Sequence, residues 1–222
     1  MMNTTNLPSI HIPGAELLLH PFRAAYWPER STLLVADLHL GKAQHFRREG
    51  IPVPKQAGNE TWDRLLSLLI DFQPKELLIL GDLFHSAYNQ VWEEFIRLVA
   101  QFDQVQFTLV GGNHDILSDY QYERSGLQLV QEPYPVGPLL LSHHPMESIP
   151  EGFYNLAGHI HPGVALSGAG RQRLRLPCFF FGQQQGLLPA FGAFTGIATV
   201  QPTAEDRVFV VTQDAVVEVF GQ

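Results

Sequence analysis

The stretch Thr32-Leu-Leu-Val-Ala-Asp37-Leu-His39 joins a short hydrophobic run to two side chains that can bind a metal ion. A run of this length, bounded by turn residues, is typical of a buried strand. The same order returns twice, because Glu76–Leu80 leads into Gly81-Asp82 and Val105–Val110 leads into Gly111-Gly112-Asn113-His114-Asp115. The sequence therefore predicts three successive strands that each end at a polar cluster.

Amphipathic helices are predicted between these strands. From Asn59 to Phe72 the hydrophobic residues recur at helical spacing, and Pro74 follows as a stop signal. A second helix is predicted from about Asn89 to Phe102 by the same spacing. Because sites in α/β proteins form beyond the carboxyl ends of strands joined by helices, we expect the three clusters to meet there.

After Leu127 the pattern changes to short strands separated by Gly and Pro turns, which predicts a second, antiparallel sheet. At 222 residues and 45% hydrophobic content, the chain is expected to form one α/β domain over residues 1–222. The predicted strands of the second half are residues 127–130, 138–141, 153–157, 174–181, 194–200, 207–211 and 216–220.

Two further clusters, Ser142-His143-His144 and Gly158-His159-Ile160-His161, complete a set of five. Carboxylate, amide and imidazole groups suit divalent Mn, Fe, Zn, Ni or Co. In Asp-x-His and His-x-His, an extended backbone would point both side chains to the same face. Each part alone has an ordinary interpretation, such as a turn, a helix cap or a core histidine. The five in this order indicate a centre with two metal ions.

Charge and cysteine content limit the class of protein. The formal charge is -8, which argues against a surface that is basic throughout, although a local basic patch is compatible with it. Cys178 is the single cysteine, so no intramolecular disulfide is expected. We expect a cytoplasmic protein without a membrane segment, because neither a signal peptide nor a long apolar stretch is recognisable.

The order of the five clusters, from Asp37 to His161, resembles that of the calcineurin-like metallophosphoesterases. The resemblance implies a four-layer αββα sandwich, in which two facing β-sheets are flanked by helices. It also implies two divalent cations, for which we expect Mn²⁺, with Fe, Zn, Ni or Co as alternatives. The implied ligands are Asp37, His39 and His161 for one cation, Asn113, His143 and His159 for the other, and Asp82 as the bridge between them.

The expected reaction is hydrolysis of a phosphodiester bond by a hydroxide that bridges the two cations. His114 lies next to the ligands and is expected to stabilise the developing charge or to protonate the leaving group. Asp115 is expected either to orient its imidazole or to act as a helix cap or turn residue. Either His143 or His144 could reach a metal, because the register of the strand before them is not known from the sequence. In the family that the chain resembles, the first histidine after this strand is the ligand, which favours His143. His144 and His85 are then candidates for contact with the substrate.

At subfamily level, Leu33–Lys42 and the segment Phe46-Arg-Arg-Glu-Gly-Ile-Pro-Val-Pro54 resemble the bacterial ligase-associated DNA damage response endonucleases. The resemblance implies a DNA substrate and partners from a DNA repair group that includes a ligase. Lys42, Arg47 and Arg48 follow the first metal motif directly and are expected to bind phosphate. The alternating Arg171, Arg173 and Arg175 predict either a second phosphate-facing stripe or a solvated edge strand.

Three other functions remain open from the sequence, one of which is a protein serine/threonine phosphatase. A small-molecule nucleotide or nucleotide-sugar phosphodiesterase or pyrophosphatase would use the same metals and His114. A scaffold that has kept the fold and lost catalysis would lack ligands, whereas every expected ligand is present here. Oligomeric state, strand preference and the metal used in the cell are not predicted.

Overall fold

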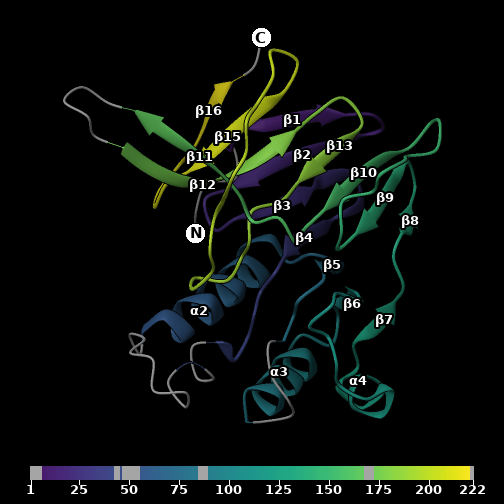
Figure 1. Cartoon of the computed structure of the whole chain (residues 1–222). Coiled ribbons are helices and arrows are strands. Elements are labelled where there is room, and N and C mark those ends of the chain that lie inside the picture. The colour runs from purple at the N-terminus through teal and green to yellow at the C-terminus, as the bar shows by residue number, and fades with distance from the viewer. Residues whose placement is uncertain (1–6, 43–45, 47–55, 85–89, 168–172, 221–222) are drawn as a thin grey trace.

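The computed structural model consists of two β-sheets packed face to face, with helices on the outer face of the first (Figure 1). The residues described are 7–42, 46, 56–84, 90–167 and 173–220. No helix within these ranges is long and apolar enough to cross a membrane.

The first sheet has the strand order β1-β2-β3-β4-β5-β6-β7. Its first four strands pair antiparallel, and β4 to β7 run parallel to one another. The carboxyl ends of β4, β5, β6 and β7 therefore lie along one edge. The strands are β1 (Ser9–Ile12), β2 (Ala15–His20), β3 (Ala24–Trp27), β4 (Thr32–Ala36), β5 (Glu76–Leu80), β6 (Gln106–Val110) and β7 (Gln128–Val130).

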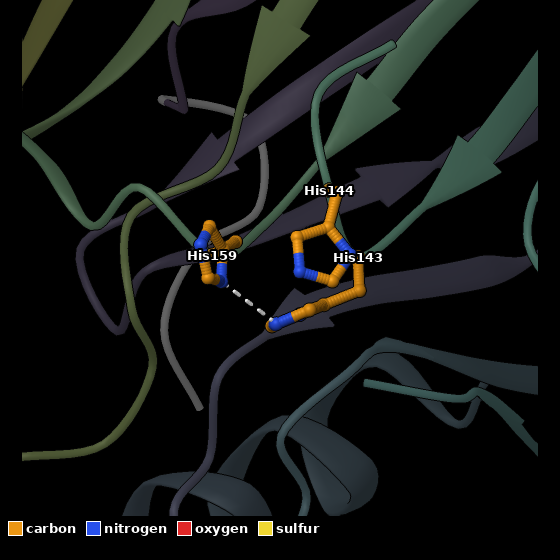
Figure 2. Close-up of side chains that lie close together, drawn as sticks. All are labelled: His143, His144 and His159. Atoms are coloured by element: carbon orange, nitrogen blue, oxygen red, sulfur yellow. Dashed lines mark hydrogen bonds between the residues drawn. The ribbon is translucent and has the colours of Figure 1, made fainter. Parts of the chain in front are cut away.

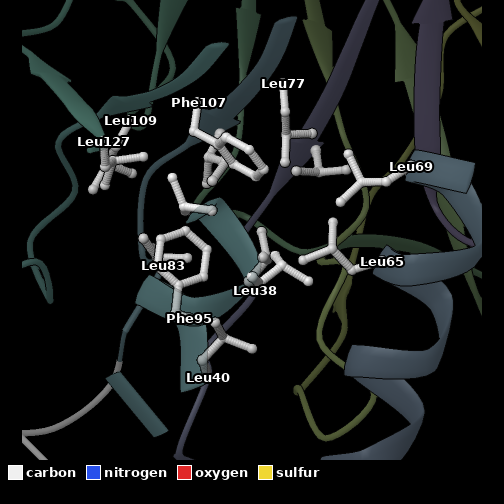
Figure 3. Close-up of a cluster of buried hydrophobic side chains, with 14 of the residues drawn as sticks. Leu38, Leu40, Leu65, Leu69, Leu77, Leu83, Phe95, Phe107, Leu109 and Leu127 are labelled. Atoms are coloured by element: carbon white, nitrogen blue, oxygen red, sulfur yellow. The ribbon is translucent and has the colours of Figure 1, made fainter. Parts of the chain in front are cut away.

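Helices cover the outer face of this sheet. Two of them, α2 (Gln56–Phe72) and α3 (Gln90–Gln101), correspond to the predicted amphipathic segments, while the short α4 (Asp119–Ser125) and the 3₁₀ turn η2 (Pro28–Arg30) were not predicted. Leu65 and Leu69 of α2 and Phe95 of α3 pack with leucines and phenylalanines of the strands (Figure 3). Leu38 and Leu40 join this core, so burial of apolar side chains anchors the segment that carries Asp37 and His39.

The second sheet has the order β14-β11-β12-β13-β10-β9-β8, with β15 and β16 added beside β12. The prediction of a wholly antiparallel sheet is wrong, because β10 pairs parallel with both β9 and β13. Short apolar runs show that a strand is buried and carry no information about its direction. The strands are β8 (Tyr134–Val136), β9 (Leu139–Ser142), β10 (Tyr154–Ala157), β11 (Pro162–Ser167), β12 (Arg173–Phe181), β13 (Gln185–Leu187), β14 (Ala198–Thr199), β15 (Arg207–Val211) and β16 (Val216–Phe220).

Two other expectations about strands also need correction. The strand after Leu127 is β7, which extends the first sheet by pairing with β6, rather than beginning the second. Only Ala198–Thr199 of the predicted strand 194–200 is extended in a sheet.

The main core lies between the two sheets and is formed by every second residue of their strands. Leu34 and Leu78 of the first sheet meet Leu139 and Phe179 of the second, while Leu33 and Leu77 face the helices. The two facing sheets and the helical flank agree with the expected fold. Across the described residues, the outer face of the second sheet carries strand side chains around Cys178 and Val208 rather than a helix.

Candidate metal centre

Each predicted ligand follows the carboxyl end of a strand. Asp37, Asp82 and Asn113 follow β4, β5 and β6 of the first sheet. His143 follows β9 of the second sheet, and the cluster from His159 to His161 follows β10. Strands β9 and β10 are parallel, as are β4 to β6. The carboxyl ends of the two sheets meet in one region, because His143 contacts Asn113 and the backbone of His159 contacts Asp37.

The ligand segments have an unusual backbone conformation. Asp37, His39 and Asp82 have φ of 53°, 48° and 46°, and His159 and His161 have φ of 65° and 53°. The left-handed region is sparsely occupied by residues other than glycine and costs about 1 to 3 kcal/mol at each position. The expectation of an extended Asp-x-His and His-x-His was therefore wrong. With left-handed residues at these positions, Asp37 and His39 share one group of donors, whereas His159 and His161 belong to two different groups.

Glycines allow the ligand loops to approach one another closely. A Cβ added at Gly81 would lie 2.1 Å from Nδ1 of His143, and one at Gly112 would lie 2.7 Å from Oδ1 of Asp82. At Gly158 the added atom would lie 2.8 Å from Oδ2 of Asp37. Three of the ligand clusters therefore contain a glycine because no side chain fits there.

One group of donors consists of Asp37, His39 and His161, whose ligand atoms lie within 4.8 Å of one another. The two Nε2 atoms of His39 and His161 are 3.3 Å apart, and Nε2 of His161 is 3.5 Å from Oδ1 of Asp37. The backbone N–H of His159 donates to the other oxygen, Oδ2, at 2.9 Å. One carboxylate oxygen thus fixes the neighbouring loop, and the other faces the imidazoles.

A second group surrounds the fully buried His143. Its Nε2 is 2.9 Å from Oδ1 of Asn113 and 3.0 Å from Nδ1 of His159 (Figure 2). Asp82 lies between the two groups, since Oδ1 is 3.5 Å from Nε2 of His143 and Oδ2 is 3.9 Å from Nε2 of His39. Burial and the neighbouring imidazoles lower the pKa of His159, which favours the neutral ring that a metal requires.

The donor set fits divalent cations. Oδ1 of Asp37 is buried, and none of the described residues provides it with a hydrogen-bond partner. An unpaired buried carboxylate oxygen is costly unless a cation compensates it. With oxygen and imidazole nitrogen donors and no thiolate in the cluster, the site suits the first-row metals named above.

His114 lies at the exposed rim of this cluster. Its ring centroid is 6.2 Å from that of His39, and its backbone N–H donates to Oδ1 of Asp82 at 3.1 Å. The metal-bridging candidate therefore also fixes the backbone of the candidate acid.

Asp115 organises the loop around its own carboxylate. Oδ1 accepts the N–H of Leu83 at 2.9 Å and of Phe84 at 3.4 Å, and Oδ2 accepts that of Gly112 at 2.9 Å. Burial raises its pKa to about 7, against the effect of these donors. The contacts favour the turn role that the sequence left open, and orientation of the His114 ring stays a prediction.

The predicted substrate cations are only partly described. Lys42 is half-buried beside the centre, where burial lowers its pKa and the carboxylates of Asp82 and Asp37 oppose that shift. Arg175 is exposed on β12, and its guanidinium donates to Oγ1 of Thr199. Arg47, Arg48, His85 and Arg171 lie outside the described residues, as does the side chain of Arg173.

Sequence reasoning missed Glu132. One of its oxygens, Oε2, accepts the backbone N–H of His143 at 2.6 Å and of His144 at 2.9 Å, and Oε1 is 2.7 Å from Nδ1 of His144. The signal that could have revealed it is the Gly137-Pro138 turn, which joins β8 to β9 and so brings the residues before β8 next to those after β9.

Taken together, the fold and the donor cluster define a metal-dependent phosphoesterase. Residues 31–179 match the model of the calcineurin-like phosphoesterase family, and the chain belongs to that family. Among solved structures it is similar to the nuclease MPE of Pseudomonas putida, with a TM-score of 0.82 and 33% identity. That match covers 96% of this chain and 100% of the other. The comparison with curated proteins gave no match.

Proposed function

We propose that this protein is a phosphodiesterase that uses two divalent cations to hydrolyse DNA. The observation that carries the proposal is the meeting of seven candidate metal ligands from both sheets at one edge, with His114 exposed beside them. The similarity to a nuclease over nearly the whole chain supports a nucleic-acid substrate.

The placement of Asp82 supports two cations rather than one. Its two oxygens face different imidazoles, those of His39 and His143, at distances that leave room for a cation on each side. Asp37, His39 and His161 would hold one cation, and Asn113, His143 and His159 the other. When bound, such cations polarise phosphoryl oxygens and lower the pKa of water.

The protein's own residues supply the remaining steps. In this proposal, His114 donates a proton to the leaving oxygen of the ester, a step that typically contributes about 10² to 10⁴ in rate. Lys42, which lies near Asp82 and Asp37, binds a phosphate oxygen through its ammonium group in the same proposal. The left-handed ligand segments hold the donors in position before substrate binds, so little reorganisation is needed.

Manganese, a role in DNA repair and association with a ligase belong to the same proposal. The repair role and the ligase are supported by the resemblance of Leu33–Lys42 and of the Gly50-Ile-Pro-Val-Pro54 segment to the ligase-associated endonucleases. Manganese is one of the metals that the oxygen and imidazole donors suit. A cytoplasmic location is proposed with them.

The test compares hydrolysis of single-stranded, nicked and duplex DNA with that of a phosphodiester reporter and a mononucleotide, in Mn²⁺ and in EDTA. We expect Mn²⁺-dependent cleavage of DNA that is lost in Asp82→Asn. His114→Ala is expected to bind Mn²⁺ as the wild type does and to cleave far more slowly. Hydrolysis of nucleotides without cleavage of any DNA would refute the choice of substrate, and activity that survives both substitutions would refute the mechanism.

A further inference from the structure

The turn that carries His143 and His144 is held by one carboxylate. Glu132 lies before β8, and β8 pairs antiparallel with β9 in the register Tyr134 to Leu141. Two residues beyond this pair in each direction, Glu132 faces His143. The hairpin therefore delivers a carboxylate to the point where the chain leaves β9 for the metal centre.

All hydrogen bonds of this carboxylate that the described residues provide go to the same turn. Oε2 accepts two adjacent backbone N–H groups, those of His143 and His144, and Oε1 meets the His144 ring at 2.7 Å. An ionised carboxylate only accepts hydrogen bonds, so Nδ1 of His144 carries a proton, and the neutral form of this ring is the tautomer without a proton on Nε2. Although burial opposes it, bonding to His144 and to these backbone groups lowers the pKa of Glu132.

The base of the turn is fixed separately. The buried Asn155 donates to the carbonyl of Leu140 and to Oγ of Ser142, and Oγ of Ser142 donates to the carbonyl of His144. These contacts hold the end of β9 against β10. They do not involve the ring of His144 or the backbone N–H groups of His143 and His144, which bind Glu132.

The ring of His144 lies against the imidazoles of both His143 and His159. His143, His144 and His159 have ligand atoms within 4.8 Å of one another (Figure 2). The ring centroid of His144 is 4.6 Å from that of His143 and 4.4 Å from that of His159. A rotation of His144, or a shift of the turn, would therefore displace the imidazoles that are candidates to hold a cation.

We infer that Glu132 is a positioning residue for the metal centre: it holds the His143–His144 turn and fixes the His144 ring in the tautomer whose Nε2 is free of a proton. This inference rests on the proposed function, because it assumes that His143 and His159 bind a divalent cation. Carboxylates that orient ligand imidazoles typically contribute a factor of about 10 to 100 to metal affinity.

The test is the dissociation constant for Mn²⁺, measured by calorimetry without substrate, in Glu132→Gln. The matched control is Glu76→Gln, because Glu76 is also half-buried, accepts a hydrogen bond from Thr108 and lies at the opposite end of β5 from the ligands. We expect Mn²⁺ binding to weaken by about 10 to 100-fold in the first variant and to be unchanged in the second. Both are compared at a temperature at which circular dichroism shows them folded.

A second measurement separates positioning from general stability. In Glu132→Gln the amide oxygen would still accept the two backbone N–H groups, so the NH₂ group would face Nδ1 of His144. Because NH₂ only donates, ¹⁵N NMR of the metal-free protein should show the ring proton moving to Nε2. Glu132→Asp, which keeps the charge one methylene shorter, is expected to lose less affinity and to serve as the folded variant if the glutamine does not fold. Wild-type Mn²⁺ affinity in both Glu132 variants, or an unchanged tautomer, would overturn the inference. Absence of Mn²⁺ binding in the wild type would instead overturn the proposed function.

Discussion

Replacing Gly81 by alanine should disturb the candidate metal centre, because the added Cβ would clash with the ring of His143. Gly81 has φ of +71°, and its added Cβ would lie 2.1 Å from Nδ1, 2.3 Å from Cγ and 2.6 Å from Cβ of His143. Ordinary contact begins at 3.4 Å. Because His143 is fully buried and packed against Asn113 and His159, its ring cannot move away without leaving both.

The size of the effect follows from two contributions. The left-handed backbone costs alanine about 1 kcal/mol relative to glycine. The clash requires a displacement of about 1 Å, and errors of that size in a catalytic group cost roughly a hundredfold in rate. We therefore expect kcat/KM for a phosphodiester reporter to fall by about a hundredfold or more, with weaker Mn²⁺ binding.

Gly152→Ala is the matched control. Gly152 also has a left-handed backbone, with φ of +86°, and an added Cβ would meet nothing within 4 Å. Urea unfolding should show about 1 kcal/mol of destabilisation from the backbone in both variants, while activity and Mn²⁺ binding fall only in Gly81→Ala. Wild-type kinetics in Gly81→Ala, or equal losses in both variants, would refute the argument from close approach.

Three further outcomes are expected. His114→Ala should lower kcat by about 10² to 10⁴ without changing Mn²⁺ affinity, and a parallel loss of metal would contradict its role as an acid. Lys42→Met should raise KM for DNA and flatten its dependence on salt, which a salt titration would measure. Burial lowers the pKa of His20 from 6.5 to about 4, with its Nδ1 accepting the N–H of Phe22. The neutral ring therefore contributes roughly 3 kcal/mol to the free energy of unfolding above pH 6.5, and this contribution is lost as the pH falls from 6.5 through 4. Urea unfolding at a series of pH values should show that His20→Asn removes this pH dependence.

The strands and candidate ligands of the first half could be predicted because their signals are local. A buried run such as Thr32–Ala36 and the donor that follows it lie next to each other in the chain, so pattern and chemistry are read together. The same holds for Glu76–Leu80 and Asp82. The structure brings these predicted ligands together, with His143 buried among them and His144 beside them.

The missed features depend on contacts between distant segments. Hydrophobic spacing predicts β9 and β10 and is silent on their parallel pairing, which is a property of the sheet. The left-handed conformation of Asp37 and His39 is imposed by the loops against which they pack. Glu132 belongs to no motif, and only the β8–β9 hairpin brings it to His144.

The left-handed ligand residues also limit what can be done with the motif in protein engineering. A peptide or a foreign scaffold that carries Asp-x-His and Gly-His-x-His would have to adopt the same disfavoured backbone without the two sheets that enforce it. Transfer of the motif residues without the surrounding strands and loops should therefore give a weak and unselective metal chelator. A transplant that keeps the ends of β4, β5, β6, β9 and β10 together with their loops is the smallest unit expected to carry the centre to another protein.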